Sequence, residues 1–193
     1  MGKQTEGLVG FLHKCRAIKE TIRYSNNDLV ERKDTVASHS WRASEIGVLL
    51  APYLEDKGVS SSKVTNMLVL HDLLEIESPE VEALGHRDKK AKVKREQEVA
   101  KTLFEGYEGE WKDSAQLLLT EFLEQTTLEA KIAKVIENYE SNMHVIEEVE
   151  PIKDPEHRKL TIDYIERRRG IIPIIDELID IQLKEIEEVS TTQ

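Results

Sequence analysis

The stretch NMLVLHDLLEIESPE, residues Asn66–Glu80, is the part of the sequence around which the rest is best interpreted. Apolar residues surround the pair His71-Asp72, and no glycine or proline interrupts the run before Pro79. Such a run is typical of a buried helix. Burying an imidazole and a carboxylate is costly unless each finds a partner or a metal ion. On an α-helix, Glu75 would lie on the same face as His71, so the stretch predicts a functional site.

The composition indicates a single, mainly helical domain. A chain of 193 residues can build one substantial core and is short for two. The hydrophobic fraction of 39% and the charged fraction of 34% fit a globular protein, and only five prolines and nine glycines interrupt residues that favour helices. We therefore expect one compact all-α domain over residues 1–193, with its motifs in 23–140 and C-terminal helices at 155–189 packing on it.

The charge and the apolar pattern exclude several classes of partner. A formal net charge of −11 argues against a nucleic-acid polymer, although a bound metal could still attract one small phosphate. No apolar stretch approaches the roughly 20 residues that a membrane span needs, and the start, MGKQTEGLVG, lacks the apolar region of a secretory signal. Cys15 is the only cysteine, so no internal disulfide can form. These features lead us to expect a cytoplasmic location.

Helical periodicity divides the rest of the sequence into amphipathic segments. In the second of these, which starts at Asp34 or Thr35, His39 falls on the apolar stripe, where a core histidine is more common than a ligand. Trp41 is assigned to the core or to a helix-packing surface, and Glu137, considered by itself, is a solvated helix residue. The expected helical segments are 8–22, about 35–50, the stretch around 66–78, 89–103, 111–123, 127–148, 160–165 and 174–189.

Three motifs follow one another along the chain, at Asp34–Arg42, His71–Ile76 and Thr127–Lys134, and in this order they resemble those of the HD-domain phosphohydrolases. Residues Asp34–Arg42, DTVASHSWR, resemble the family's E-S-V-A-E-H-S-W-R, with Ser38 in place of its second glutamate. His71–Ile76, HDLLEI, resembles H-D-L-x-E-I/A, and Thr127–Lys134, TLEAKIAK, resembles T-P-E-A-R-F-x-K. The combination is far more specific than any one motif. The most similar branch is the 5′-deoxynucleotidase-like one, whose members are compact, all-helical, often dimeric and dependent on a divalent metal.

The resemblance implies a metal site. It makes His39, His71 and Asp72 metal ligands, and Glu137 stands where the family has a fourth ligand, an aspartate. Glu140 is the alternative ligand if the helix is rotated. Two imidazoles and a carboxylate leave coordination positions open for water and a phosphate oxygen. The cation would be divalent, with Mn, Co, Mg, Zn and Fe all open.

The resemblance also implies roles in catalysis and substrate binding. Glu75 matches the acid that acts on the attacking water or the leaving oxygen, and Asp72 counts with it among the catalytic groups. Arg23 and Tyr24 match an Arg-aromatic pair that holds the phosphate and covers the base; otherwise Arg23 is a surface residue at a helix end. Glu80 stands near the place of an acid that contacts the sugar, in a segment that departs from the family's Gly-Asp.

These assignments favour a metal-dependent phosphohydrolase that acts on a nucleoside 5′-monophosphate or a similar small phosphate ester, working as a homodimer in the cytoplasm. Two alternatives stay open. The departures at Ser38, Glu137 and Pro79-Glu80 would also fit a divergent member that binds a metal or a nucleotide without turnover. In a helical interaction protein without metal, His39, His71 and Asp72 would instead form a buried hydrogen-bonded cluster.

Overall fold

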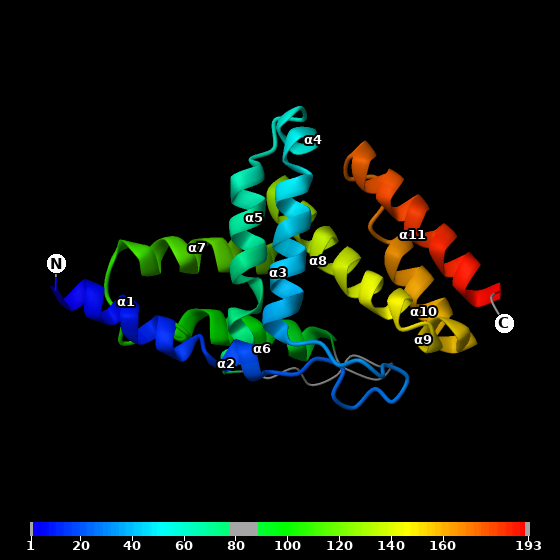
Figure 1. The fold of residues 1–193 in the computed structure, drawn as a ribbon. Coiled ribbons are helices and arrows are strands. Elements are labelled where there is room, and N and C mark those ends of the chain that lie inside the picture. Colours follow the sequence, from blue (N-terminus) through cyan, green and yellow to red (C-terminus); the bar gives the residue numbers. More distant parts are fainter. Residues whose placement is uncertain (1, 78–88, 192–193) are drawn as a thin grey trace.

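The all-α prediction is confirmed by the computed structural model, which describes residues 2–77 and 89–191. Over this part of the chain there are only helices and loops, apart from one isolated antiparallel bridge between Ile22 and Thr35 (Figure 1). The helices are α1 (Gly2–Lys14), α2 (Ala17–Glu20), α3 (Val36–Leu49), α4 (Ala51–Glu55), α5 (Ser61–Leu70), the 3₁₀ helix η1 (His71–Ile76), α6 (Lys89–Thr102), α7 (Glu110–Glu124), α8 (Leu128–Glu147), α9 (Glu150–Lys153), α10 (Pro155–Glu166) and α11 (Pro173–Thr191).

The helices that matter for the site begin at side-chain caps. Thr35 caps α3: its hydroxyl accepts a hydrogen bond from the backbone N–H of Ser38, and the Ser38 side chain bonds back to the N–H of Thr35. Thr127 caps α8 with a single bond, in which its hydroxyl accepts from the N–H of Ala130. These contacts satisfy N–H groups that the first turn leaves without intrahelical partners. The predicted start of the helix near Thr35 is therefore confirmed.

α3, α5 and α8 form the centre of the molecule. α3 and α5 lie side by side and α8 crosses behind them, while α10 and α11 pack on one end and α1, α6 and α7 on the other (Figure 1). Gly47 makes the α3–α5 contact possible, because a Cβ there would come within 2.8 Å of Leu68 Cδ1 and 3.2 Å of Thr65 Oγ1. Leu68 is fully buried. The missing side chain at residue 47 therefore sets how closely α3 approaches α5.

The segment around His71 is not one continuous α-helix as expected. α5 ends at Leu70, and the chain continues as six residues of 3₁₀ helix. A 3₁₀ helix has three residues per turn, so side chains three apart share a face, and runs of this length are uncommon. Glu75 thus shares a face with Asp72 rather than with His71. The α-helical periodicity, which predicted that Glu75 and His71 share a face, is therefore wrong for this segment.

Two buried clusters hold the helices together. The larger one joins α3, α5, α8 and α11, with Met67, Ile136 and Ile179 among its members. The smaller one is rich in aromatic side chains and packs α1 against α6 and α7, with the Phe11 and Phe104 rings 4.9 Å apart. The expected first helix, 8–22, is broken between Lys14 and Ala17 into α1 and α2.

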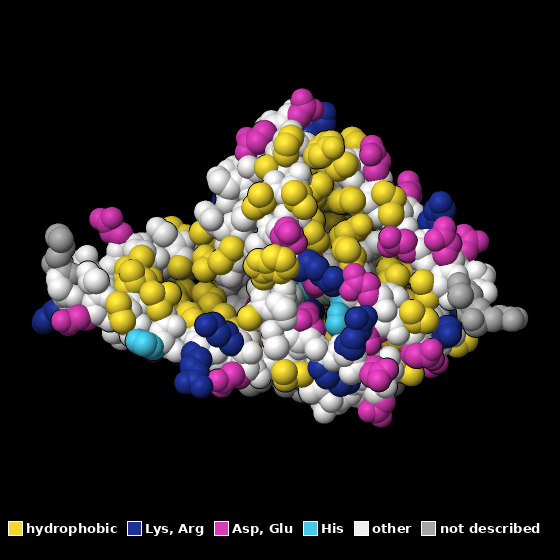
Figure 2. Space-filling model, in the orientation of Figure 1, with side chains coloured by type: hydrophobic (Ala, Val, Ile, Leu, Met, Phe, Trp, Pro, Cys, Tyr) yellow, Lys and Arg dark blue, Asp and Glu magenta, His cyan; other side chains and the backbone are white. Residues whose placement is uncertain are grey.

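One surface residue differs from expectation. Trp41, which the sequence assigned to the core or a packing surface, is 64% exposed. Trp41 belongs to α3. Figure 2 shows hydrophobic side chains gathered over the upper part of α3 and over α4, above a band of charged side chains. Among the described helices, none has both the length and the apolar composition that a membrane span requires.

Candidate metal centre

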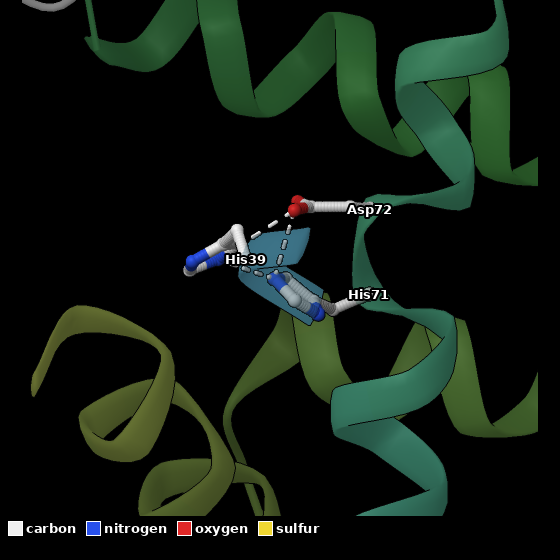
Figure 3. A group of neighbouring side chains, drawn as sticks. All are labelled: His39, His71 and Asp72. Atoms are coloured by element: carbon white, nitrogen blue, oxygen red, sulfur yellow. Dashed lines mark hydrogen bonds and ion pairs between the residues drawn. The ribbon is translucent and has the colours of Figure 1, made fainter. Parts of the chain in front are cut away.

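His39, His71 and Asp72 converge although they come from two separate elements. His39 lies in the first turns of α3, while His71 and Asp72 open η1 (Figure 3). Each residue offers one ligand atom, and these atoms lie within 4.8 Å of one another. Both histidines are buried, and Asp72 is partly exposed. The switch from α to 3₁₀ geometry occurs at His71, so the ligand pair lies where the helical pitch changes.

In each imidazole, Nδ1 faces away from the other two candidate ligands and is already hydrogen bonded, which fixes the ring's tautomer. His71 Nδ1 lies 2.7 Å from the carbonyl oxygen of Leu68 and must donate to it. His39 Nδ1 is in contact with Oε2 of Glu140, a carboxylate that accepts. If both rings are neutral, each Nε2 then carries a lone pair. Two lone pairs and the Asp72 carboxylate therefore face one point, which is the donor set of a divalent cation site.

The spacing of the three ligand atoms suits a metal ion. His39 Nε2 and His71 Nε2 are 3.2 Å apart, and Asp72 Oδ2 lies 3.1 Å from His71 Nε2 and 3.6 Å from His39 Nε2. Atoms bound to one cation at about 2.0–2.2 Å, with angles of about 90–110°, are separated by about 2.8–3.6 Å. The residues fit a divalent metal, and coordination positions remain for other ligands.

Electrostatics also favour positive charge at this point. Burial lowers the pKa of His71, but the adjacent Asp72 carboxylate and, further away, Glu137 outweigh burial, so that the pKa of His71 is raised. Burial raises the pKa of Asp72, but His71, His39 and Arg23 together hold it well below its usual range. Both shifts favour positive charge beside the Asp72 carboxylate, where a divalent cation would supply it.

Glu137, the expected fourth ligand, lies beside the three but outside their group. Its Oε2 forms an ion pair of 2.7 Å with Lys134 Nζ, one turn earlier on α8. Burial raises the pKa of Glu137, whereas Lys134, His71 and His39 lower it, to about 2. Glu137 is therefore an ionised carboxylate that interacts electrostatically with both imidazoles. Its role as a ligand stays a prediction.

Arg23 and Tyr24 lie near the site, on the chain that leads into α3. Arg23 is buried, which rules out a surface residue at a helix end; its Nη2 donates to Ser141 Oγ at 2.9 Å. Tyr24 has a left-handed backbone, with φ of 56°, and its ring stacks on His144 with centroids 5.3 Å apart. A tyrosine in this conformation is strained unless its surroundings hold it there, and such strain is common at functional sites. Substrate binding by either residue stays a prediction.

Two further candidates have different outcomes. Glu75 lies in η1, three residues after Asp72, and its side chain is only partly exposed. Its face of η1 therefore includes a candidate ligand, and its catalytic role stays a prediction. Glu80 falls outside the described residues, so nothing is said of its position.

Glu140, which the sequence analysis named as an alternative metal ligand, has a different place in the structure. Rather than joining the three ligand atoms, it lies on the opposite side of the His39 ring, at Nδ1. Its side chain is 1% exposed, and Arg42 Nε donates to its Oε1 at 2.7 Å. Burial raises the pKa of Glu140, but His39, Arg23 and Arg42 lower it by more, so the pKa is lowered overall and the group is an ionised carboxylate. The signal in the sequence was its place one turn after Glu137 on a helix that is buried on several sides.

Two histidines and an aspartate that converge from two helical elements make this chain a helical domain with a candidate metal site. Residues 15–174 match the HD domain, and the chain belongs to the HD domain family. No curated protein matches the chain.

Two solved structures resemble this one. A predicted metal-dependent phosphohydrolase from Magnetospirillum magnetotacticum MS-1 is 21% identical, with a TM-score of 0.76 over 97% of this chain and 95% of that protein. A conserved hypothetical protein from Pyrococcus furiosus is also 21% identical, with a TM-score of 0.61 over 95% of this chain and 99% of that protein. At this identity, the similarity establishes a shared fold.

Proposed function

We propose that this protein is a metal-dependent phosphohydrolase that cleaves a small phosphate ester, with a nucleoside 5′-monophosphate as the first substrate to test. The observation that carries the proposal is the convergence of His39 Nε2, His71 Nε2 and Asp72 Oδ2, with both outer imidazole nitrogens already bonded. Membership of the HD domain family and the name given to the Magnetospirillum protein support the same reaction class.

His39, His71 and Asp72 would hold the divalent cation, and Glu137 is the fourth candidate ligand. When bound, such a cation polarises a phosphate oxygen and makes a water more acidic. Each of the two imidazoles is held in place by the bond that its Nδ1 makes, so the site is already arranged for an ion. Asp72 contributes the carboxylate that converges with the two Nε2 atoms, 3.1 Å from His71 Nε2.

Glu75 would move the proton in this proposal. It shares a face of η1 with Asp72, so its carboxylate can act beside the cation without being one of the three converging ligands. Arg23, whose guanidinium charge reaches Asp72, would help to neutralise the phosphate, and Tyr24 would cover the base.

The test is a phosphate-release assay on a panel of ribo- and deoxyribonucleoside 5′-monophosphates and other small phosphate esters with Mn²⁺, Co²⁺ or Mg²⁺. We expect release that requires metal, is stopped by a chelator, and falls by a factor of about 10²–10⁴ in Glu75→Ala. Glu105→Ala is the control, since this exposed glutamate lies outside the site. No release from any compound with any of the metals would contradict the proposal.

A second candidate function is binding without turnover, which the glutamate at position 137 and the ion pair it makes with Lys134 favour. Calorimetry with Mn²⁺ and with a nucleotide separates the two, because a pure binder gives heat without phosphate release. The homodimer expected from the resemblance stays a prediction, and light scattering in solution would test it.

A further inference from the structure

Glu140 is a buried carboxylate that the proposed reaction does not use. Its Oε2 contacts Nδ1 of His39, on the side of the ring away from Asp72 and His71. Its Oε1 accepts a hydrogen bond from Nε of Arg42 at 2.7 Å. Both oxygens therefore face donors, and the side chain is almost completely removed from solvent.

The same carboxylate also lies beside Arg23. Arg23 Nη1 is 3.6 Å from Glu140 Oε2 and 3.8 Å from Asp34 Oδ2. One side chain on α8 thus contacts a candidate metal ligand on α3 and lies against a candidate phosphate-binding arginine on the segment before it. Buried charges are tolerated where they are paired in this way.

We infer that Glu140 is a positioning residue that serves both parts of the site: it fixes His39 as the Nδ1–H tautomer, and it holds the Arg23 guanidinium in place. The inference rests on the proposed function in taking His39 as a metal ligand. A histidine that binds a metal through one nitrogen generally donates its other N–H to an oxygen acceptor, and loss of that acceptor costs about 10–100-fold in metal affinity.

Glu140→Gln gives a sharp test because Arg42 can only donate. The new amide oxygen must face Arg42 Nε, which turns the amide nitrogen toward His39 Nδ1. Because the amide nitrogen only donates, His39 Nδ1 has to accept, so the imidazole proton moves to Nε2. Nε2 then has no lone pair facing Asp72 and His71. We expect Mn²⁺ affinity to fall by about 10–100-fold in this nearly isosteric variant.

The tautomer can be measured without metal. Nitrogen-15 NMR of the histidine side chains, at a mildly alkaline pH where an ordinary imidazole is neutral, distinguishes Nδ1–H from Nε2–H. We expect His39 to be Nδ1–H in the wild type and Nε2–H in Glu140→Gln. Glu147→Ala is the matched control: Glu147 also binds Arg42, at 2.9 Å, but it is 43% exposed and lies two turns further along α8 than Glu140.

Chemical rescue adds a second readout. Glu140 lines an open cavity of about 200 Å³ together with Asp34, Ser38, Trp41, Arg42 and His144. Glu140→Ala would connect the vacated space to this cavity, so formate can enter and meet Arg42 and His39. We expect formate, but not chloride at equal ionic strength, to restore part of the Mn²⁺ affinity of this variant, and to have no effect on Glu147→Ala.

The outcomes separate the two proposals. If folded Glu140→Gln keeps either the wild-type Mn²⁺ affinity or the Nδ1–H tautomer of His39, the role of Glu140 is overturned. If the wild type binds no divalent metal, the proposed function fails, and the NMR measurement still decides whether Glu140 sets the tautomer. For Arg23, an increase in KM for the substrate in Glu140→Gln with saturating metal supports the second part, and an unchanged KM overturns it.

Discussion

Replacing Glu137 by glutamine should destabilise the metal-free protein by an amount that the structure allows us to estimate. The pKa of Glu137 is lowered from 4.5 to about 2, and each pH unit corresponds to about 1.4 kcal/mol, so ionised Glu137 contributes about 3 kcal/mol. A neutral amide cannot replace that carboxylate beside Lys134. For a domain of this size, 1 kcal/mol shifts Tm by about 2–4 °C, so Tm should fall by about 6–12 °C.

The dependence on pH has a definite sign. Because the folded-state pKa of Glu137 is lowered, its contribution is complete above 4.5 and is lost as the pH falls through about 2. Urea denaturation in the presence of a chelator should therefore show the wild type losing its advantage over Glu137→Gln across that interval. The two proteins should differ most at neutral pH.

A double-mutant cycle with Lys134→Met tests the physical cause. Each single substitution leaves one buried charge without its partner, whereas the double variant leaves none, so we expect a coupling energy of about 1–3 kcal/mol. Lys131→Met is the control, because Lys131 is exposed on the same helix and should change stability by less than about 0.5 kcal/mol. Additive single effects, or a Glu137→Gln variant as stable as wild type at neutral pH, would refute the reasoning.

Three other predictions follow from the fold and the site. Met67→Ala, which truncates a fully buried side chain of α5, should lower the free energy of unfolding by about 2–5 kcal/mol in urea titrations. Thr35→Ala should cost about 1 kcal/mol by the same measurement, through loss of the α3 cap. Because the pKa of His71 is raised above its ordinary 6.5, protons should compete with metal for this imidazole above that pH. Calorimetry should therefore show Mn²⁺ affinity that still rises above pH 6.5, and proton release that disappears once the pH exceeds the raised pKa. Neither effect should occur in His71→Ala.

Much of the helical layout could be predicted from the sequence. The all-α class, the start of α3 at Thr35 and the long helix α8 follow from local signals: hydrophobic periodicity and capping residues. His39 could not be placed by such signals alone, because a histidine on an apolar stripe is more often a core residue than a ligand. Only its motif connected it with His71 and Asp72, and the structure brings these three residues together.

The errors have physical causes. Over six residues without glycine or proline, the periods of an α-helix and a 3₁₀ helix differ too little to be told apart, so the geometry of Glu75 was assigned wrongly. On α8, helices pack against several sides, so buried residues such as Asn138 and Glu140 extend beyond a single stripe. The contact of Glu140 with His39 depends on how α3 docks against α8, a long-range property that no local pattern encodes.

Gly47 has a consequence for the spacing of the candidate ligand atoms. His39 and Gly47 belong to the same helix, eight residues and thus about 12 Å apart along its axis. A methyl group at residue 47 would meet Leu68 Cδ1 at 2.8 Å, so either that side chain turns or α3 and α5 separate. Separation would carry the two imidazoles apart, because they stand on these helices and their extension. In that case a residue remote from the candidate metal site would set the spacing of its ligand atoms, while every ligand stays the same.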